Sequence, residues 1–107
     1  MPKYLIMSAC TAEGVRGTLH EGGTARREAV RLATEVLGGK LEAFYYAFGE
    51  QDVFAIVEMP DTVTAAAASI TVGAAGVARN ATVVLLTPEE LDEVGSKNVQ
   101  AYVPPRA

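Results

Sequence analysis

The sequence has few of the residues that build crosslinks and metal sites. Its 107 residues include one cysteine, one histidine and no tryptophan. A single cysteine excludes an internal disulfide and any zinc site built from several cysteines. We therefore expect the chain to fold without a structural metal.

The chain also lacks a surplus of positive charge and a long apolar run. Nine Lys and Arg residues stand against 13 Asp and Glu, a net charge of −4. A protein that binds the phosphate backbone of nucleic acids needs a basic face. No apolar run reaches the roughly 18 residues of a membrane helix, and Met1–Ile6 does not begin a signal peptide. We expect a cytoplasmic protein with neither a nucleic-acid nor a membrane partner.

Hydrophobic residues make up 50% of the chain and charged residues 21%, a balance typical of one packed domain. The apolar patterns predict strands over residues 3–10, 40–48, 53–59 and 79–86. They predict helices over residues 25–37, 61–75 and from 87 onward, and a short last strand over residues 99–103. The segment after Thr11 carries Gly14 and Gly17, so we expect a short or irregular helix there. The domain should span residues 1–95, followed by a tail over 96–107.

Helix starts are marked by residues whose side chains can accept a hydrogen bond from the first turn. Thr11, Thr24, Asp61 and Thr87 are the predicted caps. The segment Thr87-Pro88-Glu89-Glu90 has the form of a capping box with proline in the first turn.

Counting the first two helical segments as one crossover gives the order βαββαβ, an α+β fold of the ferredoxin-like type. Right-handed crossovers then require an antiparallel sheet in the order 4-1-3-2.

All four strands are apolar on both faces, although helices can cover only one face. In the second strand Leu41 and Ala43 suit the helix-packed side, so we assign Phe44, Tyr46 and Phe48 to the open side. Monomers rarely expose so large an apolar surface, and a second copy stacked by two-fold symmetry would cover it. The alternative is that residues 91–107 fold back over the open face.

Several segments together resemble the GYD family: MPKYLIMSACTAEGVRG, HEGG-TARREAV, LGGKLEAFYYAFGEQDVFAIVEMPD and VLLTPEEL. The family is named for a Gly-Tyr-Asp element at the hairpin. Here Gly49 and Asp52 stand in place, and Gln51 replaces the tyrosine. The resemblance implies a dimeric α+β barrel, in agreement with the strand pattern, and it implies no particular activity.

Three titratable residues are candidates for catalysis. His20 could act as a base or ligate a metal or haem, or it could simply face solvent at a helix end. Glu50 and Asp52 could form a carboxylate pair for acid–base chemistry, or they could serve the hairpin turn.

Ligand-binding candidates are Arg26, Arg27, Tyr45 and Arg79. The two arginines follow Gly22-Gly23 at a helix start, where an anion could bind; alternatively they are solvated. Arg79 opens the last strand and could anchor Asp52 or Glu58, or reach a ligand or neighbouring chain. The glycines form neither a P-loop nor a dinucleotide fingerprint, so we expect no cofactor.

These observations predict a homo-oligomer that binds a small anionic or aromatic molecule between sheet and helices. Two alternatives stay open: a cofactor-independent oxygenase or isomerase built on this barrel, and a structural assembly subunit. An enzyme requires a titratable group in the pocket, whereas a structural subunit would have a fully packed sheet and no pocket.

Overall fold

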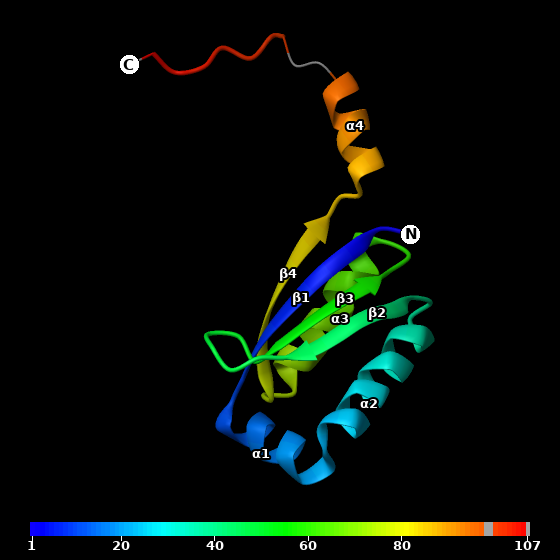
Figure 1. The fold of residues 1–107 in the computed structure, drawn as a ribbon, viewed down its shortest axis with the longest axis vertical. Helices are drawn as coiled ribbons and strands as arrows, with labels where there is room; N and C mark the ends of the chain where they lie inside the picture. The colour runs from blue at the N-terminus through cyan, green and yellow to red at the C-terminus, as the bar shows by residue number, and fades with distance from the viewer. Residues whose placement is uncertain (98–99, 107) are drawn as a thin grey trace.

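A computed structural model describes residues 1–97 and 100–106. It contains one four-stranded antiparallel sheet in the order β2-β3-β1-β4, which confirms the predicted α+β topology (Figure 1). The strands are β1 (Lys3–Cys10), β2 (Lys40–Tyr46), β3 (Val53–Glu58) and β4 (Ala78–Leu85). The helices are α1 (Ala12–Glu21), α2 (Gly23–Val36), α3 (Thr62–Ala74) and α4 (Pro88–Ser96).

Three of the four predicted helix caps are confirmed. The side chains of Thr11, Asp61 and Thr87 accept hydrogen bonds from the backbone N–H groups of Gly14, Thr64 and Glu90. The Thr87–Glu90 capping box is complete in both directions. These local signals work because each cap satisfies an N–H group that the first helical turn leaves free.

The prediction for the start of α2 was wrong. The helix begins at Gly23, and its N-cap is Gly22 at φ 96°, with no side-chain cap. Thr24 lies inside the first turn. The positive φ, which glycine adopts without strain, lets the chain turn directly from α1 into α2.

The segment carrying Gly14 and Gly17 is a short, regular helix of ten residues, so the prediction of a short or irregular helix holds for its length and not for its regularity. Gly14 is buried, and a Cβ atom there would collide with the backbone carbonyl of Val77. The amide of Thr11 donates to that same carbonyl over 3.0 Å. Gly14 therefore permits a close approach between α1 and the segment that leads into β4.

The prediction for the faces of β2 was also wrong, because the strand contains a β-bulge. The pairing with β3 shifts between Leu41 and Ala43. Leu41 packs against the helix-side core, and Phe44 and Tyr46 join it on that face. Tyr45 is paired with Phe54 on the open face and is 71% exposed. An extra residue in one strand reverses the alternation beyond it.

The core lies between the sheet and α3. Tyr4, Val57, Met59 and Ala65 are each at most 2% exposed. The Tyr4 hydroxyl lies 3.0 Å from the hydroxyl of Thr62 at the start of α3. Alanines dominate the middle of α3, and such small side chains let this helix lie close to the sheet.

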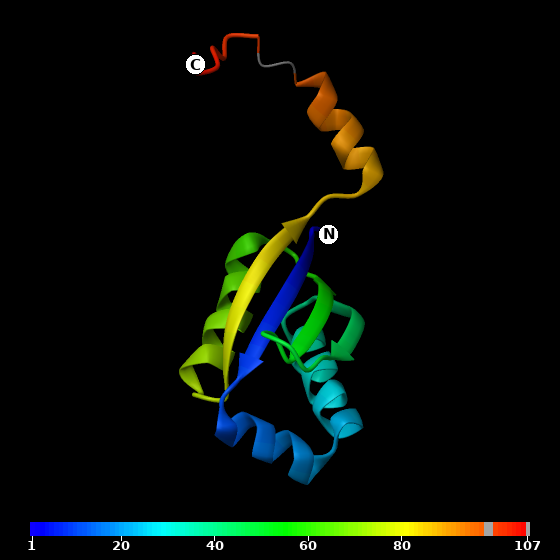
Figure 2. The same cartoon turned by 60° about the vertical axis from the view of Figure 1, so that its left-hand side comes forward.

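The C-terminal segment projects away from the sheet (Figures 1 and 2). Leu91 and Val94 of α4 are more than half exposed, so the described tail does not cover the open sheet face. Residues 100–103 form turn and irregular structure, so the predicted last strand is wrong there, while Val99 lies outside the described residues. No helix in the described part of the chain has the length and apolar character needed to cross a membrane.

Candidate ligand-binding site

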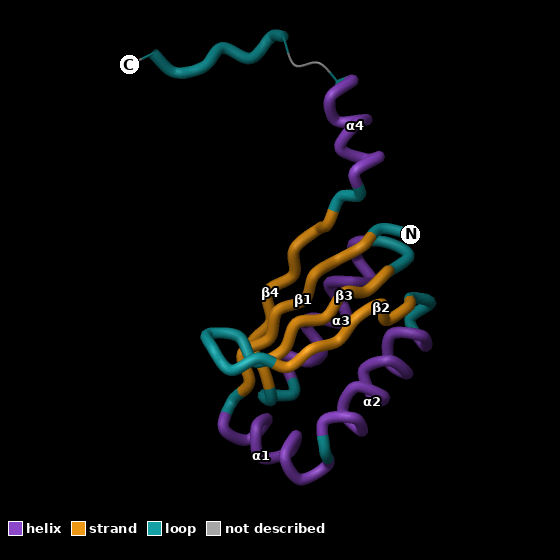
Figure 3. Tube along the Cα trace, in the orientation of Figure 1, coloured by secondary structure: helices purple, strands orange, loops and turns teal. Residues whose placement is uncertain are grey.

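A cavity of about 470 Å³ lies between the sheet and its two covering helices. α2 packs against β2 and α3 packs against β4, and these are the two outer strands. Figure 3 shows α2 beside β2 and α3 behind the sheet. Above the central strands β1 and β3, the core around Tyr4, Val57 and Ala65 fills part of the space between the helices, and the cavity occupies the rest. Its volume is within the range of small-molecule sites, roughly 300–1,000 Å³.

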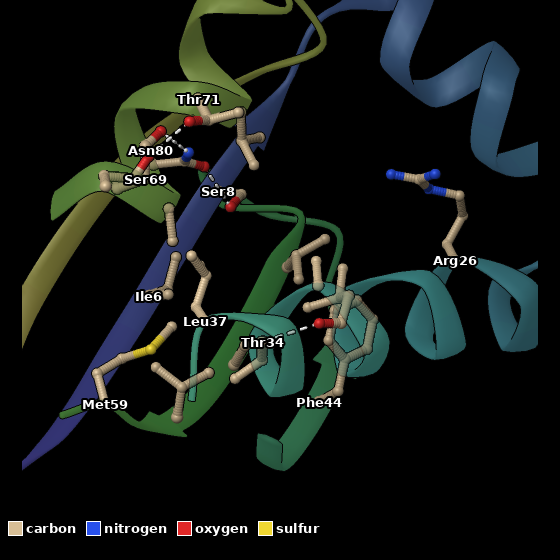
Figure 4. A pocket seen from close by; sticks show the side chains of 18 of the residues that line it. Ile6, Ser8, Arg26, Thr34, Leu37, Phe44, Met59, Ser69, Thr71 and Asn80 are labelled. Carbon is tan, nitrogen blue, oxygen red and sulfur yellow. Dashed lines mark hydrogen bonds between the residues drawn. The ribbon is translucent and has the colours of Figure 1, made fainter. Parts of the chain in front are cut away.

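β3 forms part of the floor of the cavity. The helix-facing residues Val53, Ala55, Val57 and Met59 all line it. Ala55, Val57 and Met59 are at most 4% exposed, so surrounding side chains largely cover this row. Met59, Ile6 and Leu37 gather at one end of the cavity, which is apolar (Figure 4).

Polar side chains gather at the other end, where β3 begins. Ser8 is paired with both Val53 and Asn80 across the sheet. The Ser8 hydroxyl donates to Asn80 Oδ1 over 2.6 Å, and Asn80 Nδ2 donates to the carbonyl of Ser69 over 2.9 Å (Figure 4). This chain of hydrogen bonds ties β1, β4 and α3 together.

Most of the hydroxyl groups in the lining already donate to the protein. Thr34 and Thr71 donate to carbonyls one turn earlier in their own helices, each over 2.7 Å. The Tyr46 hydroxyl donates to the carbonyl of Gly23 over 2.9 Å. Groups satisfied in this way have no hydrogen left to donate to a ligand.

Arg26 is the one charged residue among the described residues that line the cavity. It lies in the first turns of α2, and its guanidinium points toward the cavity from the rim (Figure 4). Its ion pair is with Glu21, at 3.5 Å between two substantially exposed side chains. An exposed pair of this kind contributes about 0–1 kcal/mol, so the guanidinium can exchange Glu21 for another anion.

The charge of Arg26 acts on two neighbouring groups. Burial raises the pKa of the Tyr46 hydroxyl, and the positive charge of Arg26 opposes that shift. Burial and the charge of Asp52 raise the pKa of the Cys10 thiol, again opposed by Arg26. Both groups are therefore protonated at neutral pH, so Cys10 has little nucleophilic character.

Of the four ligand-binding candidates predicted from sequence, the structure brings only Arg26 to the cavity. Arg27 is exposed and contacts Glu28. Tyr45 lies on the open face, because the bulge in β2 reverses the alternation. Arg79 is paired with Ala9 and is also exposed. Within the described residues neither Asp52 nor Glu58 forms an ion pair with Arg79; Glu58 instead pairs with Lys3 at 3.3 Å.

The three catalytic candidates do not line this cavity. His20 is exposed in the last turn of α1, and Glu50 is exposed in the loop between β2 and β3. Asp52 links the hairpin between β2 and β3 to β1. Its carboxylate accepts a hydrogen bond from the backbone amide of Cys10 over 2.7 Å, and its own backbone amide donates to the carbonyl of Ser8. No three potential metal-ligating side chains cluster within the part of the chain that the structure describes.

Sequence reasoning did not find Ser8, Asn80 or Tyr46 as cavity residues. A signal for the first two was present, since each is a polar residue inside an apolar strand. A buried polar group requires a partner, and the two side chains provide one another with it. The role of Tyr46 depends on the bulge and has no comparable signal.

Comparison with known proteins adds one finding. No curated protein and no solved structure is significantly similar to the chain. A family model described as GYD domain matches residues 4–94. That match runs from β1 into α4 and covers most of the chain, including every element around the cavity. The chain therefore belongs to the GYD family.

Proposed function

We propose that this protein binds a small molecule in the cavity between its sheet and the helices α2 and α3. The observation that carries the proposal is the cavity itself, a mostly apolar space of about 470 Å³ with one cation at its rim. Sites of this kind, mostly apolar with a few placed polar groups, are typical of ligand pockets.

The same observation argues against the two alternatives. A structural subunit would have no need of a large cavity over the centre of its sheet. An oxygenase or isomerase requires a group that takes up and releases a proton near neutral pH. The described lining contains no carboxylate and no histidine. Binding without turnover is therefore the function that the cavity favours.

We further propose that the protein acts as a homodimer formed through the open sheet face. Two cross-strand rows of apolar side chains cross this face, one from Tyr45 through Phe54 to Met7, the other from Ile56 through Leu5 to Val83. Lys3 joins Glu42 and Glu58 in ion pairs beside these rows. An apolar centre with a charged margin is the usual anatomy of a protein interface. The tail projects away, so a second copy is the occupant that we favour.

Two variants of α2 test the binding proposal. Ala33 lines the cavity and Ala29, one turn earlier, does not; both are exposed. Ala33→Trp should fill the cavity, whereas Ala29→Trp should leave it open. Native mass spectrometry of protein purified without detergent should find a small molecule on the wild type and on Ala29→Trp. Its absence from all three proteins, or its presence on Ala33→Trp at the wild-type level, would contradict the proposal.

A further inference from the structure

The two ends of the cavity differ in chemistry, and the difference specifies a class of ligand. α2 runs antiparallel to β2, since its first residue Gly23 contacts Tyr46 near the end of that strand. Tyr46 is paired with Val53, the first residue of β3. Arg26 therefore lies at the Val53 end, the same end as Ser8 and Asn80.

The opposite end offers only apolar contacts. Val57 and Met59 are 1% exposed and belong to the core, so the apolar surface open to a ligand at this end comes from Ile6 and Leu37. Any polar part of a ligand placed here would lose its hydrogen bonds to water without replacement, which is unfavourable. An apolar body fits this end, where it would contact Ile6 and Leu37.

At the polar end, the side chains differ in how many hydrogen-bond donors they have free for a ligand. The hydroxyl hydrogens of Ser8 and Tyr46 are already donated to protein acceptors. Arg26 has five N–H donors, and its acidic contact is Glu21 at a long 3.5 Å. A guanidinium with donors to spare binds a carboxylate or another planar anion by charge-assisted hydrogen bonds. The described lining contains no acidic side chain that would repel such a group.

We infer that the ligand is an amphipathic anion, with a carboxylate-type head held by Arg26 and an apolar body reaching toward Ile6 and Leu37. This inference rests on the proposed function, and it adds the chemical class and the orientation of the ligand. The head displaces Glu21 from the guanidinium, while Ser8 and Asn80 keep their mutual hydrogen bond.

Decanoate and decan-1-ol are suitable probes, because they share an alkyl chain and differ in the charge of the head. Titration calorimetry at fixed ionic strength should give tighter binding of decanoate to the wild type. Arg26→Gln should weaken decanoate binding about ten- to hundredfold, the range expected for losing a charge-assisted hydrogen bond. It should leave decanol binding unchanged. Arg27→Gln is the matched control, because Arg27 is exposed and lies outside the lining.

Three outcomes would overturn the inference. Equal affinity for the two probes in the wild type would show that Arg26 does not select an anion. An equal loss in Arg26→Gln and Arg27→Gln would show general electrostatic attraction. Failure of both probes to bind would exclude this ligand class, and the Ala33→Trp comparison would then decide separately whether the cavity binds another molecule. Thermal melting of each variant confirms that it is folded.

Discussion

Gly14 and Gly17 lie three residues apart in α1 and differ in their surroundings. A Cβ atom at Gly14 would meet the carbonyl of Val77, which is backbone and cannot move aside, whereas a Cβ atom at Gly17 would enter open space. Gly14→Ala should lower the free energy of unfolding by about 1–3 kcal/mol through overpacking. Gly17→Ala should raise it by about 0.5–1 kcal/mol, because alanine is the better helix former.

Chemical denaturation of the two variants beside the wild type measures both effects. The pair is internally controlled, since both substitutions add one methyl group to the same helix. Equal changes in the free energy of unfolding for the two variants would contradict the close approach of α1 to Val77.

Asp61 gives a prediction on pH dependence at the start of α3. The backbone N–H of Thr64 donates to its carboxylate over 2.7 Å, which lowers the pKa from 3.8. A carboxyl whose pKa is lowered by folding stabilises the protein above its unfolded pKa. That contribution is lost as pH falls through the lowered folded pKa.

Asp61→Asn keeps a capping side chain and removes the titration. Thermal melts should show the wild type as the more stable protein near neutral pH, because the negative charge also suits the helix N-terminus. The difference should shrink below pH 3.8 and disappear once Asp61 is protonated in the folded state. A difference that stayed constant down to pH 2 would exclude this role of the carboxylate.

At the scale of the elements, the sequence was informative wherever a local signal decides the structure. The caps at Thr11, Asp61 and Thr87 depend only on neighbouring backbone groups, and all three were predicted. The strand order followed from the sequence of elements and the handedness of crossovers.

The faces of β2 depend on a signal that the sequence does not carry. Residues on both sides of the strand are apolar, so a bulge between Leu41 and Ala43 leaves no mark in the pattern. The bulge exchanges Tyr45 and Tyr46 between the two faces. For the same reason the candidate site could be only partly predicted: Arg26 was found through its place at a helix start, and Tyr46 was assigned to the wrong side.

At the scale of the whole molecule, the open sheet face predicts the effect of a charge on assembly. Tyr45→Glu places a carboxylate among the apolar rows, where burial against a second copy would cost several kcal/mol. Sedimentation velocity at micromolar concentration should show a dimer for the wild type and a monomer for Tyr45→Glu. Val63→Glu is the control, because Val63 is 79% exposed on α3, away from this face. A wild-type monomer, or a stable dimer of Tyr45→Glu, would refute the interface.

The two faces of the sheet also make the location of the ligand directly measurable. Ile6 and Val57 lie on the helix side, whereas Leu5 and Val83 lie on the open side. Methyl-labelled protein with bound decanoate can report which of these groups contact the alkyl chain through intermolecular nuclear Overhauser effects. Our account predicts contacts to Ile6 and to Leu37, which also lines the cavity. Contacts to Leu5 and Val83 instead, or none to the helix-side methyl groups, would contradict it.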